Sequence, residues 1–345
     1  MQKTVFVVDD KSTNLSMAEK AMENHYRVIT LSSAEKMFKT LEKVTPDIIL
    51  LDIDMPEMDG FEALKRLKAN KLYSNIPVIF LTGLTEPAKE AQGIELGAVD
   101  FITKPFSEPV LLNRIKYHLQ IDELIRERTK QLERLKNSIV YTLADVVESR
   151  DANTGGHVAR TTVYVKMLIE ALLERKIYTD IIQEWNIDSI VSSARLHDLG
   201  KIAIPDNILN KPGPLTHDEF EIMKTHSQEG ERLIDQMIER SGDAEFLNNA
   251  KLFAGHHHER WDGKGYPHGL ANTQISLQGR IMAIIDVYDA LTTERPYKKP
   301  FPHEEALKII MDLTEVQFDP AIAEVFSQEN EQFKAVKANY EGSKY

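Results

Sequence analysis

The chain contains no cysteine. Disulfides, zinc–thiolate sites, iron–sulfur clusters and thiol catalysis are therefore excluded, and a reducing compartment is compatible with the composition. Long apolar runs are missing too, since none approaches the ~18 residues of a membrane span. Asp9 follows the first short apolar run too soon for a signal peptide. We therefore expect a cytoplasmic protein that has no membrane partner.

Basic residues are the minority among the charges. Lys and Arg total 42 against 54 Asp and Glu, which leaves a formal net charge of −12. This balance disfavours general nucleic-acid binding, although a local basic patch could still hold a phosphate. Apolar residues make up 42% of the 345 residues, enough to bury the cores of more than one domain.

Short apolar runs alternate with segments of helical length in residues 1–120. The runs are Val5–Val8, Val28–Thr30, Ile48–Leu51, Val78–Leu81 and Phe101–Ile102, and the helical segments are Leu15–Asn24, Ala34–Lys43, Phe61–Ala69 and Ala88–Leu96. This alternation predicts a doubly wound α/β domain with a five-stranded parallel sheet and helices on both faces.

Polar residues stand where the predicted strands end. Asp9 and Asp10 follow the first strand, Asp52 the third and Lys104 the fifth, and Thr82 ends the fourth. In an open parallel sheet these strand ends form the ligand-binding edge. Three carboxylates gathered there would repel one another unless a cation such as Mg²⁺ lay among them. Each residue alone could be a helix cap or a surface charge, but their coincidence favours a phosphoryl site.

Residues 1–120 resemble a response-regulator receiver domain. The resemblance is carried by Val7-Val-Asp-Asp10, Leu50-Leu-Asp-Ile-Asp-Met-Pro-Glu-Met-Asp-Gly60, Phe80-Leu-Thr82 and Asp100-Phe-Ile-Thr-Lys-Pro-Phe106. It implies that Asp52 accepts a phosphoryl group from a sensor histidine kinase and that Asp9 and Asp10 help to hold Mg²⁺. It also implies that Thr82 and Lys104 contact the phosphoryl group and that Phe101 is the aromatic switch residue.

A segment without Gly or Pro connects this domain to the rest of the chain. Two interleaved heptad series run through it, Ile121, Arg128, Leu135, Thr142 and Ile125, Leu132, Ile139. They predict a linker helix over residues 121–143 that forms a parallel coiled coil in a homodimer. The alternative is a single solvated helix that bridges the domains.

Ten of the eleven histidines lie after residue 117, in a helix-rich half of the chain. Imidazole and carboxylate ligands without thiolate suit Fe, Mn, Ni or Zn. Neighbours on a helix point about 100° apart, so the adjacent pairs His197–Asp198 and His257–His258 are better placed to reach two metals than to chelate one. Such a two-metal site lowers the pKa of bound water and clamps an in-line displacement. Alone, His157 or His226 would more often be an ordinary core or surface histidine.

Residues 137–326 resemble an HD-GYP domain. The matching motifs are Glu148-Ser-Arg-Asp151, Thr154-Gly-Gly-His157, His197-Asp-Leu-Gly-Lys-Ile-Ala-Ile-Pro-Asp206, Leu209-Asn-Lys-Pro-Gly-Pro-Leu215, His257-His-Glu-Arg-Trp-Asp-Gly-Lys-Gly-Tyr-Pro267, Asp286-Val-Tyr-Asp-Ala-Leu291, Arg295-Pro-Tyr-Lys298 and Phe318-Asp-Pro320. The resemblance implies an all-α, HD-superfamily metal phosphohydrolase that converts cyclic di-GMP to pGpG, GMP or both. The implied metal ligands are His157, His197, Asp198, His226, His257, His258 and Asp286, with His256 an extra histidine.

The same resemblance implies further roles. Lys201, one helical turn from Asp198, would stabilise a phosphoryl oxygen, and the substrate contacts would be Tyr266, Asp289, Arg295 and Lys298. Some family members place a Glu four residues before the first metal histidine, where it adds a third metal. Asn153 stands there in this chain, so we expect two metals. The polar residues 327–345 are expected to add little to the core.

The leading hypothesis is thus a response regulator whose phosphorylation at Asp52 controls hydrolysis of cyclic di-GMP. One alternative is a signalling adaptor that binds nucleotide or a partner without turnover. Another is the same hydrolase acting on cyclic GMP-AMP. A transcription factor is disfavoured because the second half has no basic recognition helix.

Overall fold

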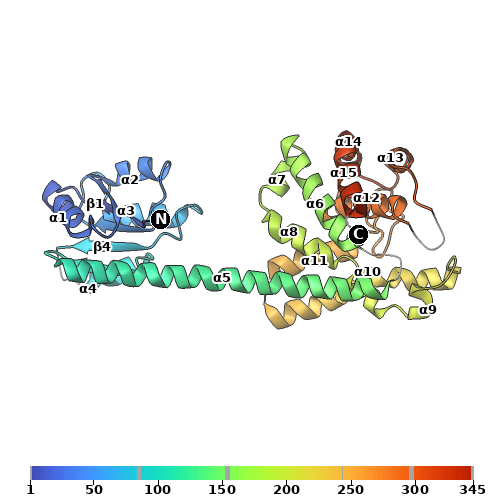
Figure 1. The fold of residues 1–345 in the computed structure, drawn as a ribbon, viewed down its shortest axis with the longest axis horizontal. Helices are drawn as coiled ribbons and strands as arrows, with labels where there is room; N and C mark the ends of the chain where they lie inside the picture. The colour runs from blue at the N-terminus through green and yellow to red at the C-terminus, as the bar shows by residue number, and fades with distance from the viewer. Residues whose placement is uncertain (1, 84–86, 152–155, 243, 295–298, 343–345) are drawn as a thin grey trace. The chain divides into compact units, whose positions relative to one another are not determined.

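The computed structural model describes residues 2–83, 87–151, 156–242, 244–294 and 299–342. Its contacts divide the chain into two compact units, Met1–Leu132 and Glu133–Tyr345 (Figure 1). Each unit has hydrophobic cores of its own. Within the described ranges, no helix combines the length and the apolar character that a bilayer crossing requires.

A five-stranded parallel sheet forms the centre of the N-terminal unit, in the order β2-β1-β3-β4-β5. The strands are β1 (Thr4–Val8), β2 (Arg27–Leu31), β3 (Ile48–Asp52), β4 (Val78–Thr82) and β5 (Asp100–Thr103). The helices are α1 (Ser12–Met22), α2 (Ala34–Leu41), α3 (Gly60–Ala69), α4 (Pro87–Glu95) and the beginning of α5 (Glu108–Arg150). The predicted doubly wound α/β fold is confirmed.

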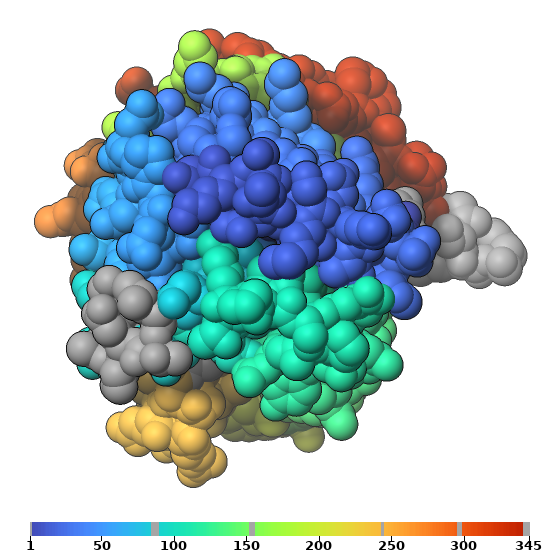
Figure 2. Space-filling view, turned by 90° about the vertical axis from the view of Figure 1, so that its left-hand side faces the viewer, coloured from blue at the N-terminus to red at the C-terminus, as the bar shows by residue number. Residues whose placement is uncertain are grey.

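Both faces of this sheet are covered because consecutive strand residues point to opposite sides. Val5 lies in one core with Met22 of α1 and Ile115 of α5. The next residue, Phe6, lies in the other core with Leu64 of α3. Figure 2 shows α1, in dark blue, beside the beginning of α5, in blue-green, on the surface of this unit.

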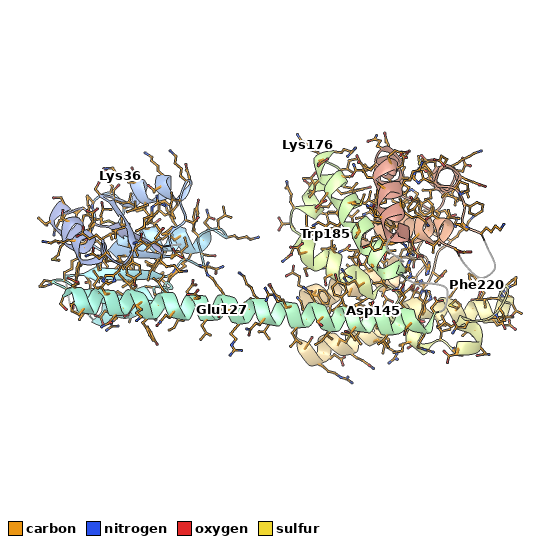
Figure 3. The ribbon with its side chains drawn as sticks, viewed as in Figure 1. Lys36, Glu127, Asp145, Lys176, Trp185 and Phe220 are labelled. Atoms are coloured by element: carbon orange, nitrogen blue, oxygen red, sulfur yellow. The ribbon has the colours of Figure 1, made fainter. Side chains whose placement is uncertain are left out.

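Helix α5 is longer than the predicted linker and runs unbroken from Glu108 to Arg150. Leu111 and Leu119 pack in the N-terminal unit, whereas Val140 and Val147 pack in the C-terminal one. The apolar seam between them is 37–66% exposed, and Figure 3 labels Glu127 within this stretch. The members of the seam are Ile121, Ile125, Leu132, Leu135 and Ile139. An exposed seam leaves self-association a prediction.

The regular elements of the C-terminal unit are all helices among its described residues, apart from an isolated bridge between Thr314 and Phe318. Its larger core gathers side chains of α6, α12 and the last helices, and a second core joins the end of α5 to α10 and α11. The predicted all-α class is confirmed. The helices are α6 (His157–Glu174), α7 (Thr179–Ile182), α8 (Ile187–Ser193), η1 (Ala194–Leu196), η2 (Leu199–Ala203), α9 (Asp206–Leu209), α10 (His217–Ser241), α11 (Ala244–His256), η3 (Asn272–Gln274), α12 (Leu277–Thr292), α13 (His303–Asp312), α14 (Pro320–Gln328) and α15 (Asn330–Gly342).

Helix α15 corrects the expectation that residues 327–345 add little to the core. Phe333 is fully buried, with its ring 4.7 Å from that of Phe326 and 5.2 Å from that of Tyr164. Val336 packs against the same core. The two apolar residues are three positions apart and so share one helix face, which lets a mostly polar helix close the core.

Candidate metal centre and phosphorylation site

Four buried histidines of the C-terminal unit point their Nε2 atoms toward one another in pairs. His157 begins α6, His197 follows η1, His226 lies within α10, and His257 directly follows α11. Their Nε2 atoms form two close pairs. The distance is 3.2 Å between His157 and His197, and 3.3 Å between His226 and His257.

The other ring nitrogen, Nδ1, is engaged in all four residues. It lies 2.7–2.9 Å from a backbone carbonyl oxygen in His197, His226 and His257, and 2.8 Å from a carboxylate oxygen of Asp289 in His157. These oxygens only accept hydrogen bonds, so Nδ1 carries the proton, and in a neutral ring Nε2 presents a lone pair. Burial would lower the pKa of His157, but Asp289 outweighs it and raises that pKa. Burial also lowers the pKa of His257 to about 3, which keeps its ring neutral.

Facing lone pairs cannot bond to one another, so the two Nε2 pairs fit a cation. Ligand nitrogens about 2.0–2.1 Å from a metal lie roughly 3.0–3.4 Å apart when they occupy adjacent positions. The observed separations of 3.2 and 3.3 Å fall within that range. The donor set is imidazole and carboxylate, which suits a divalent transition metal.

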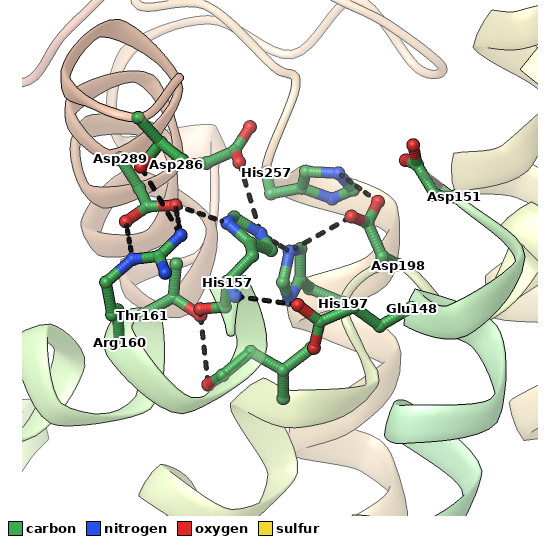
Figure 4. A network of polar contacts seen from close by, with 12 residues as sticks. Glu148, Asp151, His157, Arg160, Thr161, His197, Asp198, His257, Asp286 and Asp289 are labelled. Carbon is green, nitrogen blue, oxygen red and sulfur yellow. Dashed lines mark hydrogen bonds and ion pairs between the residues drawn. The ribbon is translucent and has the colours of Figure 1, made fainter. Parts of the chain in front are cut away.

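Asp198 lies between the two pairs. Its Oδ2 is 3.4 Å from Nε2 of His197, and its Oδ1 is 3.5 Å from Nε2 of His226 and 3.8 Å from that of His257. Asp286 Oδ1 lies 3.5 Å from Nε2 of His157. Figure 4 shows Asp198 between His197 and His257. The carboxylate of Asp198 therefore lies where it could contact two cations, one at each histidine pair.

The adjacent pair His257–His258 differs from the expectation that such a pair reaches two metals. Both residues offer ligand atoms to one group together with His226. Helix α11 ends at His256, so the pair lies in a turn where the 100° helical rotation does not apply. The extra histidine, His256, belongs to a different group with Glu231 and His268.

Lys201 and Asp151 line the cavity beside this centre. Nζ of Lys201 is 2.8 Å from Asp198 Oδ2 and 3.1 Å from Asp151 Oδ2. Burial alone would lower the pKa of Lys201, but Asp198 and Asp151 outweigh it and raise that pKa. Burial would likewise raise the pKa of Asp198, but Lys201 and His197 hold it well below its ordinary value. Both groups are therefore charged at neutral pH.

The cavity has a volume of about 290 Å³ and a mixed lining. Leu209, Leu215 and Met223 supply an apolar side. The polar lining consists of Asp151, His157, Asp198, Lys201, His226, His258, Tyr266 and Asp286. Seven sequence-predicted residues are thus brought to one cavity, and predicted ligands His197 and His257 lie directly behind its wall.

Asp289 was expected to contact the substrate, but it lies behind His157 and is not part of the cavity lining. It is 2% exposed, and Arg160 donates to its two oxygens at 2.7 and 2.9 Å (Figure 4). Burial would raise the pKa of Asp289, but Arg160 and His157 hold it far below its ordinary value. In this structure Asp289 contacts His157 and Arg160, which gives it the geometry of a group that orients the imidazole, and its expected substrate contact stays a prediction. Sequence reasoning missed Arg160. It lies three residues after His157 on the same helix, and this spacing could have indicated a contact near the histidine.

Glu259 is a second residue that sequence reasoning missed. It is 2% exposed and accepts hydrogen bonds from the backbone nitrogens of His268, Gly269 and Leu270 at 2.6, 3.1 and 2.9 Å. These bonds order the loop that carries Tyr266, whose ring lies 4.8 Å from that of His258. An acid directly after the histidine run was the available signal. Arg295, Lys298 and Asn153, which carried other predictions, lie outside the described residues.

In the N-terminal unit, the predicted phosphoryl-site residues meet at the carboxyl edge of the sheet. Nζ of Lys104 lies 2.6 Å from Asp9 Oδ2 and 2.7 Å from Asp52 Oδ1. Asp10 completes a group of three carboxylates that could hold a cation, and buried Thr82 ends the neighbouring strand β4. Burial raises the pKa of Asp52, and Lys104 only partly offsets this effect.

Two neighbouring features complete this edge. Asn14, which sequence reasoning missed, donates to both oxygens of Asp9 at 2.9 Å. The ring of Phe101 lies 5.4 Å from that of Phe80. Gly93 makes room for it, because a Cβ at this position would be 2.5 Å from Phe101 Cζ.

Comparisons with known proteins match both units. The model of the response regulator receiver domain matches residues 5–116, and that of the HD domain matches residues 141–322. A probable cyclic di-GMP phosphodiesterase of Vibrio cholerae is 40% identical over 347 residues, 96% of this chain and 79% of that protein. A cyclic di-GMP phosphodiesterase response regulator of Xanthomonas campestris is 34% identical, over 92% of this chain and 85% of that protein. A 3'3'-cGAMP-specific phosphodiesterase of Vibrio cholerae is 36% identical, over 64% of this chain and 38% of that protein.

Proposed function

The chain belongs to the response regulators that join a receiver domain to an HD-type phosphohydrolase domain, and we propose that it hydrolyses cyclic di-GMP under the control of phosphorylation at Asp52. The observation that carries this proposal is the pairing of inward Nε2 lone pairs on either side of Asp198. Two relatives that match most of this chain bear the name cyclic di-GMP phosphodiesterase.

Two divalent transition metals, Fe, Mn, Ni or Zn, would fit the donor set. His157, His197 and Asp286 would hold one, and His226, His257 and His258 the other, with Asp198 shared. When bound, such metals lower the pKa of a water and offset the charge of a phosphodiester. In the N-terminal unit, Asp9, Asp10 and Asp52 would hold Mg²⁺.

The chain's own residues would position the scissile phosphate. Lys201 lines the cavity as a charged donor and can stabilise a non-bridging oxygen of the phosphoryl group. Asp151 and Asp198 both pair with Lys201, which limits the positions that its amine can take. Tyr266 lines the same cavity and supplies an aromatic face for a base.

Turnover with a matched pair of variants tests the proposal. The full-length protein, loaded with Mn²⁺ or Fe²⁺, is incubated with cyclic di-GMP, and pGpG and GMP are separated by chromatography. His226→Ala should lose metal and hydrolysis, whereas His217→Ala, an exposed histidine at the start of the same helix, should keep both. Binding without hydrolysis in the unaltered protein would instead support the adaptor alternative.

Cyclic GMP-AMP is the second candidate substrate. It is favoured by the similarity to a relative named as specific for 3'3'-cGAMP. Measuring kcat/KM for both cyclic dinucleotides on one preparation decides between them. A higher value for cyclic GMP-AMP would replace the substrate and retain the metal centre.

A further inference from the structure

A cavity in the C-terminal unit, separate from the metal centre, is lined by the buried arginine Arg195. Its volume is about 430 Å³, and its walls come from α5, α6, α8, η1 and α11. We call it the Arg195 cavity. It is lined by Glu133, Lys136, Asn137, Tyr141, Lys166, Asn186, Asp188, Ser189, Val191, Ser192, Arg195 and Phe246.

Arg195 has unused hydrogen-bonding capacity. The residue is 9% exposed, and its buried Nε has no hydrogen-bond partner among the described residues. One terminal nitrogen donates to the hydroxyl of Tyr141, and the guanidinium lies 3.5 Å from the centre of that ring. No carboxylate of the described chain forms an ion pair with it. The cation thus has one buried donor without an acceptor and no ion-pair partner among the described residues, which is unfavourable for a buried charge.

The surrounding charges favour an anion. Lys136 and Lys166 join Arg195 in the lining, against the acids Glu133 and Asp188, so the lining itself has one more positive than negative charge. Outside the lining, Glu170 lies 3.9 Å from Nζ of Lys166. The carboxylate of Asp145, labelled in Figure 3 one turn along α5 from Tyr141, acts on Arg195 without forming an ion pair with it. An anion in the cavity would supply the missing stabilisation.

We propose that the Arg195 cavity binds a small phosphorylated molecule, with nucleotides as the expected class. A guanidinium can donate to a phosphate oxygen from its terminal nitrogens, and the flanking lysines add further positive charge. The volume lies within the range of small-molecule sites. Polar side chains of Asn137 and Ser189 line the same cavity and can contact a ribose or a base.

Occupation of this cavity would act on the metal centre through η1. Arg195 lies two residues before His197, and the carbonyl oxygen of Ala194 holds Nδ1 of His197 at 2.9 Å. A phosphate bound by Arg195 would therefore pull on the short turn that orients a metal-binding imidazole. The expected effect is a change in kcat, because the ligand does not occupy the substrate cavity.

Calorimetric titration of the full-length, metal-loaded protein with 5′-GMP and with inorganic phosphate tests the binding. The unaltered protein should show a binding site beyond the metal centre. Arg195→Met should weaken that site at least tenfold, which is about 1.4 kcal/mol, and Lys166→Met should weaken it less. Arg240→Met, an exposed arginine on α10, is the control and should bind as the unaltered protein does. GMP binding without phosphate binding identifies a nucleotide site, and binding of both identifies a general phosphate site.

Two calorimetric results would refute the proposed ligand site. One is a single binding site in the unaltered protein, and the other is unchanged binding in both Arg195→Met and Lys166→Met. If Arg195→Met fails to fold, as judged by circular dichroism, Lys166→Met decides alone, because the side chain of Lys166 is 51% exposed and its loss leaves the fold intact.

Kinetics provide an independent arm that rests on the proposed hydrolase function. With saturating cyclic di-GMP, GMP should change kcat in the unaltered protein and leave kcat of Arg195→Met unaffected. An effect confined to KM would mean competition at the metal centre and would refute the regulatory role. Loss of GMP binding in Arg195→Met together with no hydrolysis by any form would refute the proposed function and leave the ligand site standing.

Discussion

Replacing Asp289 with Asn should release one metal position and spare the other. The carboxylate accepts three hydrogen bonds, one from Nδ1 of His157 and two from Arg160. An Asn amide must turn its NH₂ group toward one of these donors. The less costly orientation opposes only Nε of Arg160, so Asn still accepts from His157, but as a neutral group.

The magnitude follows from those contacts. Arg160 is 6% exposed, and without the carboxylate its charge has lost its principal partner. Losing a buried charged pair costs about 3–5 kcal/mol, and because Asn keeps part of the bonding, we expect a loss of about 3 kcal/mol in the free energy of unfolding. Support of a metal-bound histidine by a carboxylate is worth 10- to 100-fold in metal affinity. The position held by His226 and His257 should be unaffected, because backbone carbonyls hold their Nδ1 atoms.

The assay is a chelator titration with metal analysis, accompanied by urea unfolding of the metal-free protein. Asp289→Asn should pass through a stable state with one metal per chain, whereas the unaltered protein loses both metals over a narrow range. Asp235→Asn is the matched control, since Asp235 forms a half-exposed pair with Lys251 worth at most about 1 kcal/mol. Simultaneous loss of both metals, or a stability no lower than that of the control, would refute the reasoning.

Three further predictions concern phosphorylation, self-association and metal count. Asp52→Asn should block labelling by a small phosphodonor and leave the metal content unchanged; continued labelling would show that another residue is the acceptor. The double substitution Leu132→Asp and Leu135→Asp should lower the mass measured by light scattering, because both side chains are exposed in the predicted seam. An unchanged mass would exclude the seam as the dimer contact. Metal analysis and anomalous scattering should find two metals per chain, as expected from Asn153, and three fully occupied positions would contradict this.

The sequence predicts the N-terminal fold well because each signal there is local. Val5 to Val8 and Ile48 to Leu51 are β-branched or apolar runs, and their strands are buried on both faces. The site at the strand ends follows from topology alone, since parallel strands bring Asp9 and Asp52 to one edge.

The metal centre is different, because its residues come from separate helices and turns. Motif spacing identifies His197 and Asp198 as candidates, but it cannot show which ring nitrogen faces inward. That property depends on carbonyl oxygens three residues back and on Asp289, 132 residues from His157. For the same reason sequence reasoning placed Asp289 in the substrate cavity, since only packing reveals that Arg160 encloses it.

The end of α5 offers a physical route from the receiver domain to the metal centre. Glu148 accepts a hydrogen bond from the backbone nitrogen of His157 at 2.7 Å, and Asp151, directly after the helix, lies 3.1 Å from Nζ of Lys201. Arg150 donates to a carbonyl oxygen of the turn after Lys201 at 2.6 Å. An α-helix rises about 1.5 Å per residue, whereas catalytic groups must stay within about 0.5 Å of their working positions. A shift of α5 by a fraction of one residue would therefore displace His157 and Lys201 together. If the proposed control of hydrolysis by Asp52 holds, it would require no large rearrangement of the C-terminal unit.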